Sequence, residues 1–320
     1  MLAYVGVTRF ESEKVMPKTT QDHDAGTVLK ARGARSASGE DGVLDLTLAH
    51  SPDSDDAFMF YALATNKVRA DGLKLTHILE DIQTLNEKAR QDVYDITAVS
   101  THAYAYLTEN YVLLPSGASF GDGYGPMVVG HGPAVGPDGL RGKRVAVPGK
   151  MTTAYLALML YEREVETVVV PFDEILQFVS SGAADAGVVI HEGQLTYSLE
   201  GLSKLVDLGE WWQNETGLPL PLGGNVIRRG LGTAVMRDVA RLVKESIQYA
   251  LDHREEALVY ATQFSRGLDP ATTDRFIAMY VNDWTLDYGE RGRRAVQMLL
   301  DRGFESGILP ERVQAEFVKS

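Results

Sequence analysis

The chain has 320 residues, of which 44% are hydrophobic and 23% charged, a balance typical of a globular protein with room for two domains. Its 31 basic and 44 acidic residues give a net charge of -13 without a basic stripe, which argues against nucleic acids and anionic membranes as partners. The absence of cysteine excludes disulfides, Cys-based zinc sites and thiol nucleophiles, and no apolar run approaches the roughly 20 residues that span a bilayer.

Residues 1–43 differ from the rest because they are polar and rich in Gly, Ser and Arg. They lack the basic start, apolar core and small-residue cleavage site of a signal peptide. We predict a mostly disordered extension. The alternative is a wrongly assigned start codon, with Met16 as one candidate for the true start. The missing export signal predicts a cytoplasmic protein.

From residue 44 onward, predicted strands and helices alternate in two similar sets. The first set comprises a strand with alternating Leu residues, a turn, a helix, a strand, a helix and a strand, at 44–48, 50–56, 57–66, 73–79, 82–90 and 96–100. The second repeats that order at 144–147, 148–151, 152–161, 167–170, 172–180 and 186–190. Helices at 233–262, 270–284 and 290–302 end the chain.

Alternating strands and helices predict an α/β fold with mostly parallel sheets and right-handed crossovers. Because the set occurs twice, we expect two lobes around a ligand cleft, rather than one larger doubly wound sheet. The Gly-rich connectors 121–139 and 217–232 are candidate hinges or crossovers. We assign the large lobe and the small lobe to the following residues: 44–137 plus 225–320, and 138–224.

Polar residues follow the predicted strands, at the sheet edge where ligands bind in open α/β folds. The candidates are Ser51, Asp56, Ser100, Thr101, His102, Ser116, Thr152 and Thr153. Thr152 and Thr153 lie at a helix N-terminus, where free N–H groups attract anions, although a capping role explains them equally well. For Asp53 and Asp55, simple capping of the first helix is the stronger interpretation.

His191 is the sharpest single candidate for a catalytic group. It directly follows the apolar run at 187–190, so that a rigid strand should hold it at the cleft, and its ordinary pKa lies near neutral. His102 and His50 occupy similar junctions and compete for the role of base. No metal-binding His spacing, dinucleotide fingerprint or phosphate-binding loop occurs, so we expect neither a metal nor an organic cofactor.

The string His-Ser-Pro-Asp-Ser-Asp-Asp-Ala-Phe-Met at 50–59 resembles the opening motif of the menaquinone-biosynthesis proteins of the futalosine pathway. Two homologous enzyme groups there, chorismate dehydratases and 1,4-dihydroxy-6-naphthoate synthases, share the fold of type II periplasmic binding proteins. Five further stretches are similar to the second group: 187–192, 195–197, 206–212, 216–224 and 289–296.

This resemblance implies a cofactor-independent carbon–carbon lyase that converts cyclic dehypoxanthine futalosine to 1,4-dihydroxy-6-naphthoate. It assigns the general base to His191, with Glu192 orienting or shielding it. It also places substrate contacts on the following residues: Ser100, Thr101, His102, Thr152, Thr153 and Ala154. The implied partner is a small anionic aromatic or nucleoside-derived substrate, and the sequence leaves a homodimer open.

The chain departs from the family pattern at two places. The usual first motif, Ser-Pro-Cys-Pro-Asn-Asp-Thr, here carries Asp53, Ser54, Asp55 and Ala57 at the Cys, second Pro, Asn and Thr positions. A carboxylate in place of an amide would repel an anionic ligand. The usual Arg after His-Glu-x is also missing, because Gln194 stands there.

Two other functions are consistent with the same residues. A non-catalytic binding protein for a small carboxylate fits the expected fold, although a periplasmic receptor would need an export signal. Chorismate dehydration fits the wider family, although the His-Glu pair and the Gly-Glu-Trp-Trp run at 209–212 point away from it. A purely structural protein is the weakest interpretation, because packing does not require polar residues at every strand end.

Overall fold

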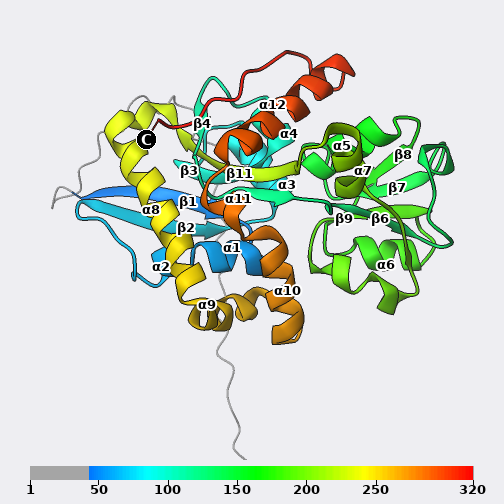
Figure 1. Ribbon diagram of the computed structural model, residues 1–320, viewed down its shortest axis with the longest axis horizontal. Coiled ribbons are helices and arrows are strands. Elements are labelled where there is room, and N and C mark those ends of the chain that lie inside the picture. The colour runs from blue at the N-terminus through cyan, green and yellow to red at the C-terminus, as the bar shows by residue number, and fades with distance from the viewer. Residues whose placement is uncertain (1–42, 320) are drawn as a thin grey trace, which may run out of the picture. The chain divides into compact units, whose positions relative to one another are not determined.

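The structure is a computed structural model that describes residues 43–319, so the predicted extension lies almost wholly outside the described residues. Figure 1 shows how the elements are arranged. They form two sheets, as the repeated set of strands and helices predicted. Both sheets are mixed instead of mostly parallel, because the strands outside the repeated β–α–β units pair antiparallel. No helix within the described part of the chain combines the length and the apolar character needed to cross a membrane.

The first sheet has the strand order β2-β1-β3-β11-β4, with β5 paired to β11. Its strands are β1 (Leu44–His50), β2 (Leu73–Leu79), β3 (Ile96–Ser100), β4 (Tyr111–Leu113), β5 (Ser119–Gly121) and β11 (Leu220–Arg228). β1 runs parallel to β2 and β3, which are the predicted β–α–β units. β11 returns from the second sheet and pairs antiparallel with β3, β4 and β5.

The second sheet has the order β10-β6-β9-β7-β8. Its strands are β6 (Met127–Gly130), β7 (Arg144–Val147), β8 (Glu166–Val169), β9 (Ala186–Val189) and β10 (Ser203–Asp207). β7 is parallel to β8 and β9, whereas β6 pairs antiparallel with β9 and β10. The chain therefore passes between the two sheets at other residues than the expected lobe boundaries. Residues 127–130, expected in the large lobe, pair in the second sheet. Residues 220–224, expected in the small lobe, already belong to β11 of the first sheet.

Helices cover both sheets. Those of the first half are α1 (Ser54–Met59), α2 (Tyr61–Ala64), α3 (Ile82–Ala89) and α4 (Thr101–Tyr104). The second half contributes α5 (Thr153–Tyr161), α6 (Ile175–Ser180) and α7 (Leu208–Thr216). The C-terminal helices are α8 (Thr233–Asp252), α9 (Arg254–Ala261), α10 (Pro270–Tyr280), α11 (Asp283–Leu286) and α12 (Gly289–Glu305). Short 3₁₀ helices follow at η2 (Glu192–Leu195) and η5 (Thr262–Phe264), among others.

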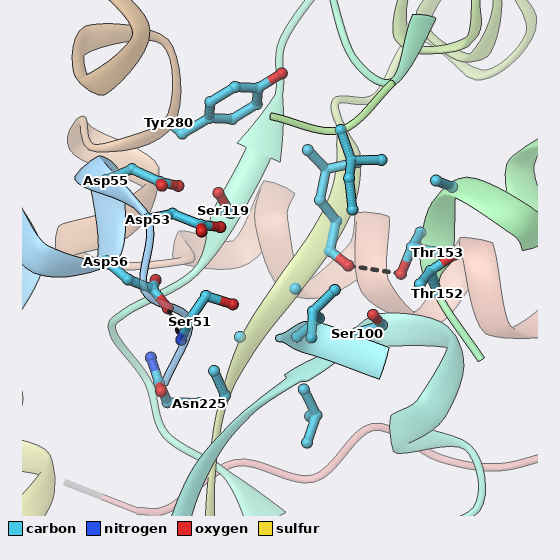
Figure 2. A pocket seen from close by; sticks show the side chains of 18 of the residues that line it. Ser51, Asp53, Asp55, Asp56, Ser100, Ser119, Thr152, Thr153, Asn225 and Tyr280 are labelled. Atoms are coloured by element: carbon cyan, nitrogen blue, oxygen red, sulfur yellow. Dashed lines mark hydrogen bonds between the residues drawn. The ribbon is translucent and has the colours of Figure 1, made fainter. Parts of the chain in front are cut away.

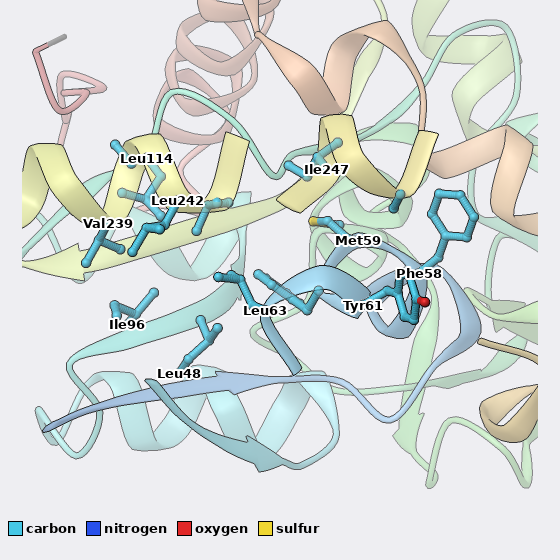
Figure 3. Packing of buried hydrophobic residues seen from close by; sticks show 14 of the residues in the cluster. Leu48, Phe58, Met59, Tyr61, Leu63, Ile96, Leu114, Val239, Leu242 and Ile247 are labelled. Carbon is cyan, nitrogen blue, oxygen red and sulfur yellow. The ribbon is translucent and has the colours of Figure 1, made fainter. Parts of the chain in front are cut away.

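The largest core cluster lies between the first sheet and the helix layer of α1, α2 and α8. Leu48 and Ile96 project from the sheet toward Leu242 of α8, and Ile247 lies farther along the same helix (Figure 3). These side chains are at most 1% exposed, so that each stabilises the fold by about 1.5–3 kcal/mol relative to exposure. This core fixes β1 and α1, and with them Ser51 and Asp53 of the connecting turn and Asp55 and Asp56 of α1.

The C-terminal helix α12 packs against the cores of both sheets. Val296 and Leu300 belong to a cluster on the first sheet, whereas Leu299 is buried with the residues of β7 and α5. The amphipathic period of α12 thus presents neighbouring positions to different cores.

Candidate active site

One pocket lies where the two sheets bring their polar loops together, and it encloses about 790 Å³ of space, open solvent at its mouth included. It is lined by Ser51, Asp53, Asp55, Asp56, Met59, Ile82, Ala98, Val99, Ser100, Gly117, Ser119, Pro126, Thr152, Thr153, Ala154, Ile190, Gln194, Leu222, Gly223, Gly224, Asn225 and Tyr280. Figure 2 shows the carboxylates and Tyr280 on one side and the two threonines on the other.

Six predicted site residues line this pocket: Ser51, Asp56, Ser100, Thr152, Thr153 and Ala154. They come from the β1–α1 turn, from the end of β3 and from the start of α5, as the strand-end argument predicted. The two sheets therefore place residues distant in sequence around a common space. The role of these residues in binding a substrate stays a prediction.

The threonine hydroxyls are already bonded within the protein. Thr152 caps α5, because its Oγ1 accepts from the Tyr155 N–H at 3.2 Å and donates to the Gly149 carbonyl at 2.7 Å. Thr153 donates to the Leu222 carbonyl of β11 at 2.5 Å, a bond drawn in Figure 2. An anion here would therefore meet the backbone N–H groups of the first turn of α5, which have no partner within a helix.

Thr101, His102 and Ser116 were predicted at the site but do not line the pocket. All three are buried: Thr101 and His102 lie on α4, which packs against α5, whereas Ser116 lies in the loop between β4 and β5. The His102 Nδ1 bonds to the Thr152 carbonyl at 3.2 Å, and burial lowers the pKa of His102 to about 4. His102 therefore supports the start of α5 instead of facing the cavity.

His191 is also absent from the lining, although its neighbours Ile190 and Gln194 belong to it. The Gly193 N–H donates to Nδ1 at 2.9 Å, so Nε2 carries the proton and donates to the Phe172 carbonyl at 3.0 Å. Burial, together with the nearby Arg266, lowers the pKa of His191, while Glu192 opposes that shift. The expectation of an imidazole open to the cleft is thus not met here: the ring is neutral and both nitrogens are engaged.

Three aspartates form one wall of the pocket (Figure 2). Asp53 occupies the N-cap position of α1 but makes no capping bond, so the capping interpretation of its carboxylate is wrong; the carboxylate binds Arg266 instead. Loss of solvation and the nearby carboxylates raise the pKa of Asp55 well above its usual value. The same causes raise the pKa of Asp56 to about 7, against the opposing bond from the Ser51 N–H at 2.8 Å.

Several residues that line the pocket were not predicted from the sequence. Tyr280, at the end of α10, donates to the Gln194 Oε1 at 2.6 Å, and Gln194 Nε2 donates to the Gly125 and Val189 carbonyls at 3.0 Å. Gln194, which replaces the expected Arg, is therefore a fixed part of the wall. Asn225 lies on β11, in a stretch that the sequence suggested was a connector, and its buried Oδ1 has no partner among the described residues.

No group of three or more His, Cys, Asp and Glu side chains in residues 43–319 is arranged to hold a metal ion. The aspartate wall instead faces hydroxyl groups and backbone N–H groups across the pocket. The arrangement offers hydrogen-bond donors on one side and carboxyls whose protonation depends on pH on the other.

Comparison with known proteins shows the family of this chain. The sequence profile of the family described as menaquinone biosynthesis matches residues 46–305. A protein of Thermus thermophilus named 1,4-dihydroxy-6-naphthoate synthase is 42% identical over 85% of this chain and 99% of its own length. A protein of Streptomyces coelicolor with the same name is 39% identical over 83% of this chain and 95% of its own length.

Solved structures agree with the architecture. A crystal structure of an Archaeoglobus fulgidus protein superposes with a TM-score of 0.79 at 46% identity, over 82% of this chain and 98% of that chain. The alkanesulfonate-binding protein of Xanthomonas axonopodis has a TM-score of 0.65 at 14% identity, over 85% and 96% of the two chains, and so shows the fold alone. The two mixed sheets form a periplasmic-binding-protein-like fold, and the chain belongs to the menaquinone biosynthesis family.

Proposed function

We propose that this chain is a carbon–carbon lyase that forms 1,4-dihydroxy-6-naphthoate from cyclic dehypoxanthine futalosine. The observation that carries the proposal is the 42% identity to a synthase of that product over 99% of that synthase's length. The family match at residues 46–305 includes every pocket segment. The resemblance of the motif at 50–59 supports the same reaction.

The pocket suits a small anionic aromatic or nucleoside-derived substrate. Met59, Ile82 and Leu222 supply apolar surface for a ring system. The first turn of α5 supplies backbone N–H groups and the positive end of a helix dipole for a carboxylate. Ser51, Ser100 and Ser119 supply hydroxyls for sugar oxygens.

His191 is the general base of the proposed mechanism. Because Nε2 already carries the proton that bonds Phe172, the lone pair on Nδ1 is the basic group. The His191 ring does not border the pocket, so as the substrate enters, the bond from the Gly193 N–H must open and Nδ1 must reach the pocket to take a proton from the substrate carbon. Loss of that proton starts ring opening, and formation of the aromatic naphthoate drives it forward.

The test is incubation with cyclic dehypoxanthine futalosine, with detection of 1,4-dihydroxy-6-naphthoate by mass spectrometry. We expect product with the native chain, and a fall in kcat of about 10²–10⁴-fold in His191→Ala. His131→Ala, which removes an exposed histidine, is the matched control and should keep native turnover.

Each outcome separates one part of the proposal. Native turnover in His191→Ala would exclude the base role, and absence of product with the native chain would exclude the reaction. A parallel incubation with chorismate tests dehydration, and tight binding of cyclic dehypoxanthine futalosine without product would favour a binding protein. The cytoplasmic location stays a prediction, which cell fractionation with an antibody would check.

A further inference from the structure

Arg266 joins two carboxylates that follow strands of different sheets. It lies in the turn between η5 and α10, with a backbone φ of 54°. Its Nη2 is 2.8 Å from Asp53 Oδ1 in the β1–α1 turn, and its Nη1 is 2.9 Å from Glu192 Oε2, just after β9. One guanidinium therefore connects a turn of the first sheet to a turn of the second.

Glu192 obtains its charge balance from residues outside the second sheet. Its side chain is only 3% exposed, and its second oxygen, Oε1, accepts from the Ser54 hydroxyl at 2.8 Å. A buried carboxylate is stable only when it is paired and hydrogen-bonded. Ser54 of α1 and Arg266 provide these partners, so both residues hold the turn at 191–192.

Arg266 also contacts the second residue that fixes His191. Its guanidinium carbon lies 4.8 Å from the centre of the Phe172 ring, within cation–π distance. The Phe172 ring meets the His191 ring edge-on at 5.5 Å, and the Phe172 carbonyl accepts the His191 Nε2 proton. Arg266 thus touches both Phe172, whose carbonyl accepts the His191 proton, and Glu192, which follows His191 in the chain.

We propose that Arg266 is a positioning residue of the reaction, which ties the His191–Glu192 turn to the Asp53–Ser54 turn and thereby places the His191 imidazole for proton removal. The inference rests on the proposed function of His191. Arg266 does not contact the reacting atoms and acts only through Glu192 and Phe172. A displacement of about 1 Å in a base costs about 10²-fold in rate, which is the scale of effect expected.

The experiment compares Arg266→Gln, Arg266→Lys and the double variant Arg266→Gln/Glu192→Gln with the native chain. In Arg266→Gln we expect kcat to fall by about 10²-fold with KM near its native value, because the base moves while the substrate contacts remain. Arg266→Lys keeps the charge and should recover part of kcat. Arg241→Gln, which removes an exposed arginine paired with Glu245, is the matched control and should leave both constants unchanged.

Thermal unfolding of each variant separates positioning from folding. The double variant leaves no unpaired charge at Glu192, so it should stay folded and still show the low kcat. A variant that is folded and keeps native kcat, or whose kcat falls only with its folded fraction, overturns the proposal. An inactive native chain or a fully active His191→Ala would overturn the proposed function, and the role of Arg266 with it.

Discussion

Asp55 is the residue whose charge state decides what the aspartate wall does to an anion. It stands where the family motif has Asn, it lines the pocket, and its pKa is raised well above the usual value by loss of solvation and by Asp56, Asp53 and Glu192. While protonated, the carboxyl can donate a hydrogen bond much as an amide does. Once ionised, it repels a carboxylate ligand, so the replacement is tolerable only below its raised pKa.

Asp55→Asn should therefore raise kcat/KM most at alkaline pH. At a pH low enough for Asp55 and Asp56 to stay protonated, the native and variant walls carry the same charge, and kcat/KM should be similar. As pH rises further, the native wall ionises and repels the substrate, so the ratio of variant to native kcat/KM should increase. A pH series of initial rates measures this ratio, with Asp138→Asn, whose side chain is 87% exposed, as the control. A ratio that is constant with pH would contradict the repulsion of the substrate by ionised Asp55.

The sequence predicted part of this site at the level of residues. The rule that ligands bind at the carboxyl ends of strands predicted Ser51, Asp56, Ser100 and the Thr152–Thr153 pair, because parallel strands end at the same sheet edge. It could not predict that the Phe172 carbonyl and the Gly193 N–H engage both nitrogens of His191. Nor could it identify Arg266, since the turn that carries it gives no periodic signal and its partners are distant in sequence.

At the scale of elements, the start of α7 packs directly on the loop between β5 and β6. A Cβ atom added at Gly209 would lie 1.9 Å from the Tyr124 carbonyl oxygen and 2.1 Å from its carbon. Both groups are backbone, so neither can move aside cheaply. The Leu208 N–H also donates to the Pro126 carbonyl at 3.0 Å, which locks the two connections between the sheets together.

Gly209→Ala should therefore destabilise the protein by about 1–3 kcal/mol, the usual cost of overpacking a tight contact. The measurement is the free energy of unfolding in urea. Gly230→Ala is the matched control, because an added Cβ there meets nothing within 4 Å. Equal stability of the two variants would show that the α7 contact is loose.

The β–α–β units were predictable at this scale because hydrophobic alternation and turn residues are local signals. The place of β11 was not, because the stretch at 217–232 is rich in glycine and its pairing partners are set by tertiary contacts. Residues 127–130 were expected in a Gly-rich connector within the large lobe, but they form β6 of the second sheet, because a short apolar strand does not reveal the sheet in which it pairs.

At the scale of the whole molecule, α12 links the two cores. Leu299 is fully buried against the second sheet, whereas Val296 and Leu300 pack on the first. Loss of order in one core would therefore expose part of the other. The two sheets should unfold together as one cooperative unit, despite the pocket between them.

Leu299→Ala tests this coupling. Removal of a fully buried leucine side chain should cost about 2–5 kcal/mol. The urea transition should shift to lower concentration and remain single when followed by circular dichroism and by tryptophan fluorescence. Leu199→Ala, at an 83% exposed leucine, should leave the transition in place. Two separated transitions would mean that the sheets unfold independently.

The position of β11 also matters while the chain is being made. β3 ends at Ser100, but its antiparallel neighbour is not complete until Arg228 has been added. At the usual rates of translation, this interval is roughly ten seconds. Throughout it, one edge of β3 lacks its hydrogen-bonding partner, and an unpaired edge is a template for pairing with other chains. The nascent protein therefore passes through a stage in which ribosome-associated chaperones have a defined strand edge to protect.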